Sequence, residues 1–323
     1  MKLFMKITAL VLLVVFTAVS PLILDKKLSD TGAEEKPPSV VLTLWHADTF
    51  EGGTGSRQDF LMKTAIAFEK QNEGVLVSVI KHSEESVREN FSSGVFPDMI
   101  SFGIGINCVA EYAKPLKTHK NNAFFNSASS GGVQYFYPYA YGRYFIFGAK
   151  AKEGKKRGVS AGKNNLPLFA AKRGGFENFE IYEPLGCYTA FVSGKITEML
   201  GTQRDVYRLI RRGVEFTAEP FGDYTDLVQY IAVTAKDDRR AALSEKFAEF
   251  LLSEETQERL KEIGLFSPVG AAVDYGEEIV NSLSAFPPSA VLSALLDGEK
   301  YSELKSGDGK DDIFEKFEKY LRF

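Results

Sequence analysis

The sequence predicts an α/β fold, because short apolar segments alternate with amphipathic ones after the first forty residues. Buried strands are expected at 41–45, 75–80 and 97–103, with helices at 56–73 and 83–91 between them. Strands connected in this way form a parallel sheet with helices on both faces. The 323 residues, 44% of them hydrophobic, provide enough apolar material for one large or two ordinary domains.

The loop after the first strand is the main candidate for a functional site. Ligands of open α/β sheets bind beyond the carboxyl ends of the strands, where loops and helix N-termini face solvent. The loop is rich in glycine and hydroxyl groups, and Ser56 with Asp59 is a capping-box-like start for the helix that follows. Its candidate ligand-binding residues are Trp45, Asp48, Phe50, Glu51, Thr54 and Arg57. An ordinary connection without a ligand role remains the alternative.

Four tyrosines alternate with other residues in a later segment, at positions 135, 137, 139 and 141. In an extended segment this spacing places all four rings on one face. Such a stripe suits the wall of a cleft, because a tyrosine presents a flat apolar ring and a polar tip to a sugar-like ligand. A strand that is half exposed to water is the alternative.

The rest of the chain contains one expected loop and several further elements. The glycine- and lysine-rich stretch 150–173 lacks periodicity and predicts an exposed loop. A helix is expected to start at Thr202, with Asp205 as its capping partner. Other expected elements are a strand at 226–233 and helices at 240–252, 254–263 and 311–321. The apolar stripe of the last helix indicates core packing.

The N-terminus predicts export. Lys2 and Lys6 precede an apolar run that ends at residue 24, so residues 1–24 are expected to be a signal peptide or an N-terminal anchor. Residues 25–38 have the composition of a linker. The protein is therefore expected in the periplasm or at the extracellular face of the membrane. The net charge of −4 and the pI near 5.7 argue against nucleic-acid binding.

The sequence contains binding groups but no recognisable catalytic or metal site. The GIG at 103–105 lacks the third glycine of a dinucleotide site, and GGTGSR lacks the GK[ST] ending of a phosphate-binding loop. The three histidines lack metal-ligand spacing, and no catalytic serine motif is present. We therefore expect no cofactor, no metal and no catalytic residue. Cys108 and Cys187 permit one disulfide, but two free thiols are favoured.

Several segments in order resemble the extracellular solute-binding proteins of ABC importers, the family that includes the maltose-binding group. The opening LTLWHADTFEGGTGSRQDF, followed by PDMISFG, is similar to the family's first and third strands with the ligand loop. PYAYGRYFIFGAK resembles its crossing strand, and AFVSGKITEMLGTQRD resembles its GK-AM-G segment. The resemblance continues through YTDLVQYIAV and KFAEFLLSEETQERLKEIGLFSPV, so it covers most of residues 40–270.

This resemblance implies a type II periplasmic-binding-protein-like fold, with a ligand cleft between two lobes. Lobe one would comprise 39–138 with 229–283, and lobe two 139–228 with 284–323. The second lobe is expected to be reduced, because the chain is short between residues 150 and 188. Gln203 and Arg204 stand where many sugar binders of the family place a tryptophan, which favours a small ligand over a large oligosaccharide.

The function expected from the resemblance is capture of a small polar solute, most readily a sugar, and its delivery to an ABC permease. The protein would act as a monomer, without catalysis. The crossing strand and second lobe would add Tyr139, Tyr141, Arg143, Gln203, Arg204 and Tyr224 to the binding residues of the loop. A membrane-anchored sensor or scaffold of the same fold and a secreted carbohydrate-active enzyme are the alternatives.

Overall fold

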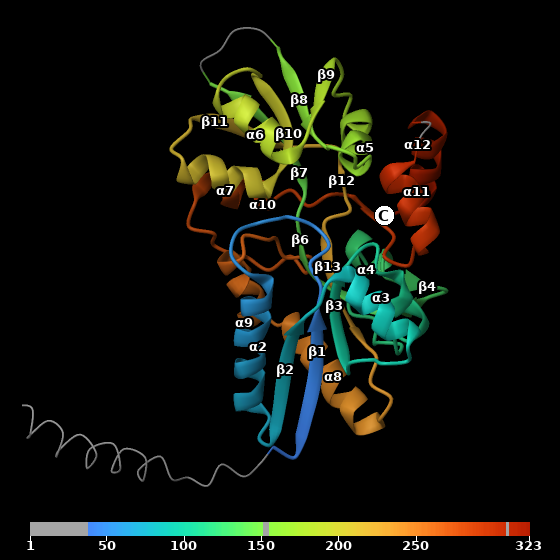
Figure 1. Ribbon diagram of the computed structural model, residues 1–323. Helices are drawn as coiled ribbons and strands as arrows, with labels where there is room; N and C mark the ends of the chain where they lie inside the picture. The colour runs from blue at the N-terminus through green and yellow to red at the C-terminus, as the bar shows by residue number, and fades with distance from the viewer. Residues whose placement is uncertain (1–37, 151–154, 308–309) are drawn as a thin grey trace, which may run out of the picture. The chain divides into compact units, whose positions relative to one another are not determined.

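Five strands form the first sheet, in the order β2-β1-β3-β13-β6. They are β2 (Val75–Lys81), β1 (Val40–His46), β3 (Met99–Gly103), β13 (Val228–Val233) and β6 (Phe136–Tyr141) (Figure 1). The structure is a computed structural model, and it describes residues 38–150, 155–307 and 310–323. β1 is parallel to β2 and β3, whereas β13 is antiparallel to β3 and β6. The predicted strands are confirmed, but the sheet is mixed.

Helices pack around this sheet where the apolar periodicity predicts them. Helix α2 (Arg57–Gln71) follows β1, and its cap is as expected, because the Ser56 side chain accepts a hydrogen bond from the Asp59 backbone N–H. The predicted helix 254–263 is divided into a short α-helix and a 3₁₀ turn. The other elements of this lobe are α3 (Glu84–Ser92), η1 (Asn107–Glu111), α4 (Ala123–Asn126), β4 (Ser129–Ser130), β5 (Val133–Gln134), α8 (Asp238–Leu251), α9 (Glu254–Glu258) and η2 (Arg259–Glu262).

The second sheet has the order β11-β7-β10-β8-β9. Its elements are β7 (Tyr144–Ala149), β8 (Arg157–Ser160), α5 (Leu166–Arg173), β9 (Phe179–Tyr182), α6 (Pro184–Val192), β10 (Glu198–Thr202), α7 (Gln203–Arg211) and β11 (Phe216–Pro220). The predicted capping box between Thr202 and Asp205 is present at the start of α7. The chain passes from the first sheet to the second just after Tyr141 and returns just before Val228.

The prediction of an exposed loop at 150–173 is wrong for most of that stretch. Residues 157–160 form β8, and α5 begins at Leu166. Leu166, Phe169 and Ala170 of α5 are buried. The short apolar segment LPLFAA shows no alternation because neighbours cover it on several sides, so periodicity alone could not reveal it. Residues 151–154 lie outside the described part of the chain.

The C-terminal segment contacts both lobes. Its elements are α10 (Glu278–Ser284), β14 (Ala290–Leu292), α11 (Gly298–Ser306), α12 (Lys310–Lys319) and β15 (Leu321–Arg322), with β12 (Tyr224–Thr225) completing a three-stranded sheet β12-β14-β15. Helix α10 lies against β11, and β14 and β15 lie against α4. The Phe317 ring of α12 is buried against Phe169 and Tyr224, which confirms the predicted core packing. The helix ends before Leu321, because Leu321 pairs with β14.

The two cysteines are free, as favoured from the sequence, with Cys108 half-buried and Cys187 buried. Burial raises the pKa of both thiols. None of the helices within the described ranges has the length and apolarity needed to cross a bilayer. The predicted export segment 1–24 and nearly all of the linker 25–38 lie outside the described residues.

Candidate functional site

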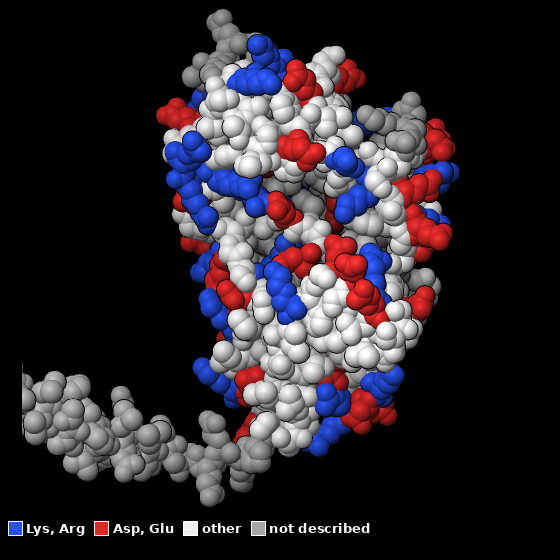
Figure 2. Space-filling view, viewed as in Figure 1, with Lys and Arg blue, Asp and Glu red and all other residues white. Residues whose placement is uncertain are grey.

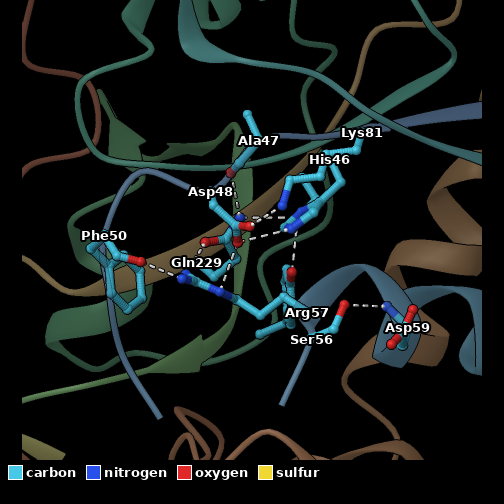
Figure 3. A network of polar contacts seen from close by, with 11 residues as sticks. His46, Ala47, Asp48, Phe50, Ser56, Arg57, Asp59, Lys81 and Gln229 are labelled. Carbon is cyan, nitrogen blue, oxygen red and sulfur yellow. Dashed lines mark hydrogen bonds and ion pairs between the residues drawn. The ribbon is translucent and has the colours of Figure 1, made fainter. Parts of the chain in front are cut away.

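A polar network that extends from buried side chains of the first sheet to the partly exposed Asp48 anchors the loop between β1 and α2 (Figure 3). His46, at the end of β1, lies 3.0 Å from Ser101 Oγ through Nδ1 and 3.0 Å from Asp48 Oδ1 through Nε2. Asp48 also forms ion pairs with Arg57 Nε at 2.9 Å and with Lys81 Nζ at 3.0 Å. One carboxylate of the loop is thereby joined to three neighbouring side chains, two of them always cationic.

The protons of this network can be assigned from its partners. Asp48 can only accept, so His46 Nε2 donates to it and Nδ1 accepts the hydroxyl proton of Ser101. The Ser101 oxygen then accepts from Tyr139 OH at 2.8 Å and from Gln229 Nε2 at 3.1 Å. Each of these buried groups has its partner, which is the condition under which a buried polar network is stable.

The pKa values agree with this arrangement. Burial lowers the pKa of His46, so the ring is neutral at pH 7. Burial acts to raise the pKa of Asp48, but the His46 hydrogen bond and the Arg57 charge outweigh it and hold that pKa well below its usual range. Ser101, His46 and Asp48 are hydrogen-bonded in the order of a hydrolase triad, and no sequence motif indicates this arrangement. Ser101 is wholly buried and lines none of the cavities described below, so the network is a structural anchor.

The anchor fixes the aromatic and acidic tip of the loop. The Arg57 guanidinium lies 4.3 Å from the centre of the Phe50 ring and donates to the Phe50 carbonyl and to Gln229 Oε1. Gly53 has a φ of +66°, and a Cβ there would collide with the Ile263 carbonyl. Only glycine fits this close contact. The loop is therefore pressed against the turn after η2, with Phe50 and Glu51 directed to the cleft.

A cavity of about 240 Å³, here called the central cavity, lies between the two lobes. Thr49, Phe50, Glu51 and Ile104 line it from the first lobe. The second lobe contributes its strand ends and the start of α7, and α11 contributes Tyr301 and Lys305. Figure 2 shows the surface hollowed between the lobes, with side chains of both charges around the opening.

Asp226 is the main acidic group of the second-lobe wall. Its carboxylate is buried and accepts a hydrogen bond from Tyr144 OH at 2.8 Å. No described Lys, Arg or His forms an ion pair with Asp226, and burial raises its pKa to about 6. A buried carboxylate with spare acceptor capacity at a cavity wall is suited to accept hydrogen bonds from a ligand.

A second cavity of about 480 Å³ adjoins the first and is here called the arginine cavity. The two share the lining residues Phe50, Glu51, Arg204 and Arg208. Contacts across the lobes border it, since Glu51 forms an ion pair with Arg204 and Arg211 donates to the Thr54 hydroxyl. Helix α7 thus meets the loop of the first lobe directly.

The structure places half of the sequence-predicted binding residues at these two cavities. Phe50, Glu51 and Arg204 line both, and Asp48, Thr54 and Arg57 line the arginine cavity alone. Arg57 is almost fully used by Asp48, Gln229 and Phe50, so it positions the loop.

The other six predicted residues lie elsewhere. Trp45 packs on His82, with ring centres 4.3 Å apart, and on Phe91. Gln203 accepts from the Arg143 backbone N–H beside Gly142, where a Cβ would collide with it. Tyr139 and Tyr224 are fully buried, and Tyr141 and Arg143 line two different cavities away from the central one.

The tyrosine stripe therefore does not form a wall of the central cavity. All six residues of β6 are buried, because β13 pairs with the strand and neighbouring aromatic side chains cover it. A period of two shows which residues share a face, but the covering of each face is decided by segments far away in the chain.

The sequence analysis missed part of the cavity lining, including Thr49, Tyr144, Asn164, Asp226, Tyr301 and Lys305. Thr49 and Asp226 stand next to predicted elements, one in the loop and one at the start of a predicted strand. Their positions beyond strand ends could have pointed to them. Tyr301 and Lys305 lie on a helix with no such indication.

Comparison with known proteins shows the fold. No family model and no curated protein matches the sequence. A cyclo/maltodextrin-binding protein complexed with maltotetraose superposes with a TM-score of 0.61 at 15% identity, covering 89% of this chain and 97% of that one. The GacH receptor of Streptomyces glaucescens, solved unliganded and with acarbose, superposes with a TM-score of 0.58 at 14% sequence identity. The match covers 88% of this chain and 98% of that one. The cyclic alpha-maltosyl-1,6-maltose binding protein of Arthrobacter globiformis superposes with a TM-score of 0.61 at 12% sequence identity. The match covers 88% of this chain and 98% of that one. The predicted two-lobe fold is confirmed.

Proposed function

We propose that this protein is an exported solute-binding protein that captures a small polar solute, most readily a sugar, and delivers it to an ABC permease. The observation that carries the proposal is the central cavity, which both lobes enclose with polar groups and aromatic rings. The similarity in fold to sugar-binding proteins supports it. The lobes expected from the sequence, 39–138 with 229–283 and 139–228 with 284–323, are kept in this proposal with two boundaries moved to 141 and 228, because β6 and β13 lie whole in the first sheet.

The volume of the central cavity favours a ligand of about one sugar ring. Pockets for drug-sized ligands span roughly 300–1,000 Å³, and this cavity measures about 240 Å³. An oligosaccharide therefore does not fit it in the described form. The size agrees with the small ligand expected from Gln203 and Arg204.

The lining chemistry fits a polyhydroxylated molecule. Sugar hydroxyls both donate and accept, and the cavity offers acceptors at Asp226, donors at Lys305 and both at Asn164. The rings of Phe50, Tyr144 and Tyr301 provide the flat apolar surfaces that suit sugar C–H faces. From these contacts we propose a working binding set of Phe50, Glu51, Arg204, Tyr144, Asn164, Asp226, Tyr301 and Lys305.

The proposed mechanism is hinge closure. The two crossings of the chain between the sheets, after Tyr141 and before Val228, are the natural hinge. A ligand favours the closed form because only there do groups from both lobes contact it together. The ion pair between Glu51 and Arg204 joins the lobes in the described form and would stabilise closure. No catalytic step belongs to this proposal.

The test is ligand-dependent thermal melting of the full-length chain against sugars, polyols, amino acids and polyamines. A ligand at a hundred times its dissociation constant adds about 2.7 kcal/mol to the free energy of unfolding. Asp226→Asn should abolish the shift, whereas Asp238→Asn, at a fully exposed carboxylate of α8, should retain it. If no compound shifts the melting temperature, the capture function is contradicted, and turnover of a glycoside would favour the enzyme alternative.

A further inference from the structure

We propose that the captured sugar carries an acidic group, such as a phosphate, a sulfate or a carboxylate, and that the arginine cavity holds this group. The inference rests on the proposed function and specifies its ligand class. The sugar ring would occupy the central cavity, and the acidic group would lie beyond Phe50 against α7.

The two cavities are placed for one ligand that spans both. They share Phe50, Glu51, Arg204 and Arg208 as lining residues, so no protein layer thicker than these side chains separates them. Phe50 is held in place by Arg57, with its ring 4.3 Å from the guanidinium. A sugar stacked on this ring would direct a substituent into the arginine cavity.

The arginine cavity has an excess of positive charge. Arg57, Arg204, Arg208 and Arg211 line it, against the carboxylates of Asp48 and Glu51 alone. The charge of Asp48 is already balanced by Arg57 and Lys81. Glu51 is paired with Arg204. Both carboxylates that line the arginine cavity are therefore paired with other cations, and neither pairs with Arg208 or Arg211.

Arg208 and Arg211 are the two arginines that pair with neither carboxylate of the cavity lining. Arg211 forms no ion pair with another described residue, and Arg208 forms one, with Asp205 at the start of α7. Among the described residues, the polar partner of Arg211 is the uncharged Thr54 hydroxyl. The nearest carboxylate to Arg208 is that of Asp205, at 3.5 Å, and it also accepts a hydrogen bond from the Thr202 N–H at the start of α7. Arg208 and Arg211 are three residues apart, so both lie on one face of α7. Figure 2 shows Lys and Arg side chains gathered over this part of the second lobe.

An oxyanion is the ligand chemistry that completes such a site. The guanidinium is a planar fork of N–H donors that matches carboxylate and phosphate oxygens two at a time. Two guanidiniums on neighbouring turns of one helix can therefore bind the oxygens of one acidic group. Neutral sugars offer no charge to these arginines, so the site distinguishes acidic sugars from their neutral parents.

The test compares acidic sugars with their neutral parents by titration calorimetry on the full-length chain. The panel pairs glucose, galactose and mannose with their 6-phosphates and uronates, and it includes inorganic phosphate alone. We expect at least one acidic sugar to bind about tenfold or more tightly than its neutral parent and than inorganic phosphate. This advantage should decline from 0.05 to 0.5 M salt, because salt screens partly exposed charges.

Variants of α7 then locate the acidic group. Arg211→Gln should reduce binding of the acidic sugar about tenfold or more and leave the neutral parent unchanged, because Arg211 lines the arginine cavity and not the central one. Arg208→Gln should also reduce binding of the acidic sugar about tenfold or more, with a smaller loss for the neutral parent, because Arg208 lines both cavities. Arg212→Gln is the matched control, since Arg212 is an exposed residue that lines neither cavity. Equal losses in all three variants would overturn the assignment.

The outcomes separate this inference from the function on which it rests. If neutral sugars bind as tightly as acidic ones, the acidic class is overturned and sugar capture stands. If inorganic phosphate binds as tightly as every acidic sugar, the arginine cavity takes an adventitious ion only and the inference is overturned. If no sugar of either class binds, the inference and sugar capture both fall.

Discussion

Two carboxylates stand on opposite sides of the cleft and differ in how they are partnered. Asp48, in the first lobe, is 34% exposed and contacts His46, Arg57 and Lys81, which together hold its pKa below the usual range. Asp226, in the second lobe, is buried and receives a hydrogen bond from Tyr144, and burial raises its pKa to about 6. The more exposed group is thus the more firmly ionised one.

This difference distinguishes positioning from binding. The partners of Asp48 come from β1, α2 and β2, so its network fixes the loop that carries Phe50 and Glu51. Asp226 retains acceptor capacity and lines the central cavity. A satisfied network makes a rigid support, whereas a buried carboxylate without a cationic partner costs stability that a ligand can return.

Removing the centre of the satisfied network should have the largest effect. Arg57→Ala leaves Gln229 Oε1 and the Phe50 carbonyl without their donor and removes a buried partner of Asp48. We expect a loss of about 3 kcal/mol in the free energy of unfolding. Urea denaturation measures it. Lys81→Ala is the control, because Lys81 is 56% exposed, and it should cost about 1 kcal/mol or less. Equal effects would contradict the support role.

Replacing Asp226, the buried carboxylate without a cationic partner, should change stability in the opposite direction. The pKa of Asp226 rises from the ordinary 3.8 to about 6 on folding. Between these pH values the native state holds a proton that the unfolded chain releases, so stability falls as pH rises through this window. Asp226→Asn removes that loss and should stabilise the ligand-free protein by about 2–3 kcal/mol at pH 7. Melting curves from pH 4 to 8 check it, and an unchanged pH slope in the variant would contradict it.

A smaller loss is expected where the network meets the first sheet. Ser101→Ala removes the donor to His46 and the acceptor for Tyr139 and Gln229. The expected cost is about 1–3 kcal/mol in the free energy of unfolding. Because Ser101 is wholly buried, the ligand affinity measured by calorimetry should stay within about twofold of that of the parent protein. This change is well below the tenfold change in affinity that corresponds to about 1.4 kcal/mol. A larger loss of affinity would show that Ser101 acts at the ligand site.

The smallest effect should be optical. Trp45 is the single tryptophan, and it packs on His82 and Phe91 without lining either cavity. If the first-lobe support stays rigid while the lobes close, ligand binding should leave the tryptophan emission spectrum nearly unchanged. A marked shift with a ligand confirmed by calorimetry would show that the support moves.

The sequence allowed the first-lobe side of the cleft to be predicted better than the second. The strand before the loop and the Ser56 cap depend on residues a few positions apart, and both are confirmed. In the second lobe the start of α7 at Thr202 is confirmed for the same reason, but the cavity wall around it was missed. Asp226 and Lys305 line the same cavity, but 78 residues lie between them in the sequence. They were missed because this separation hides their proximity. Tyr139 was predicted to line the cleft, because the alternation of tyrosines along the strand does not reveal that β6 is covered on both faces.

Local order along the chain thus determined the alternation of strands and helices, the helix caps and the position of the glycine-rich loop, since each depends on backbone preferences within a few residues. Tertiary structure decided which carboxylate gained cationic partners and which remained without one at a cavity. That choice depends on burial and on contacts between segments more than 50 residues apart, such as His46 with Ser101. The aspartate that is anchored and the aspartate that faces the cavity are the same residue type, and only their surroundings make one a support and the other a candidate ligand group.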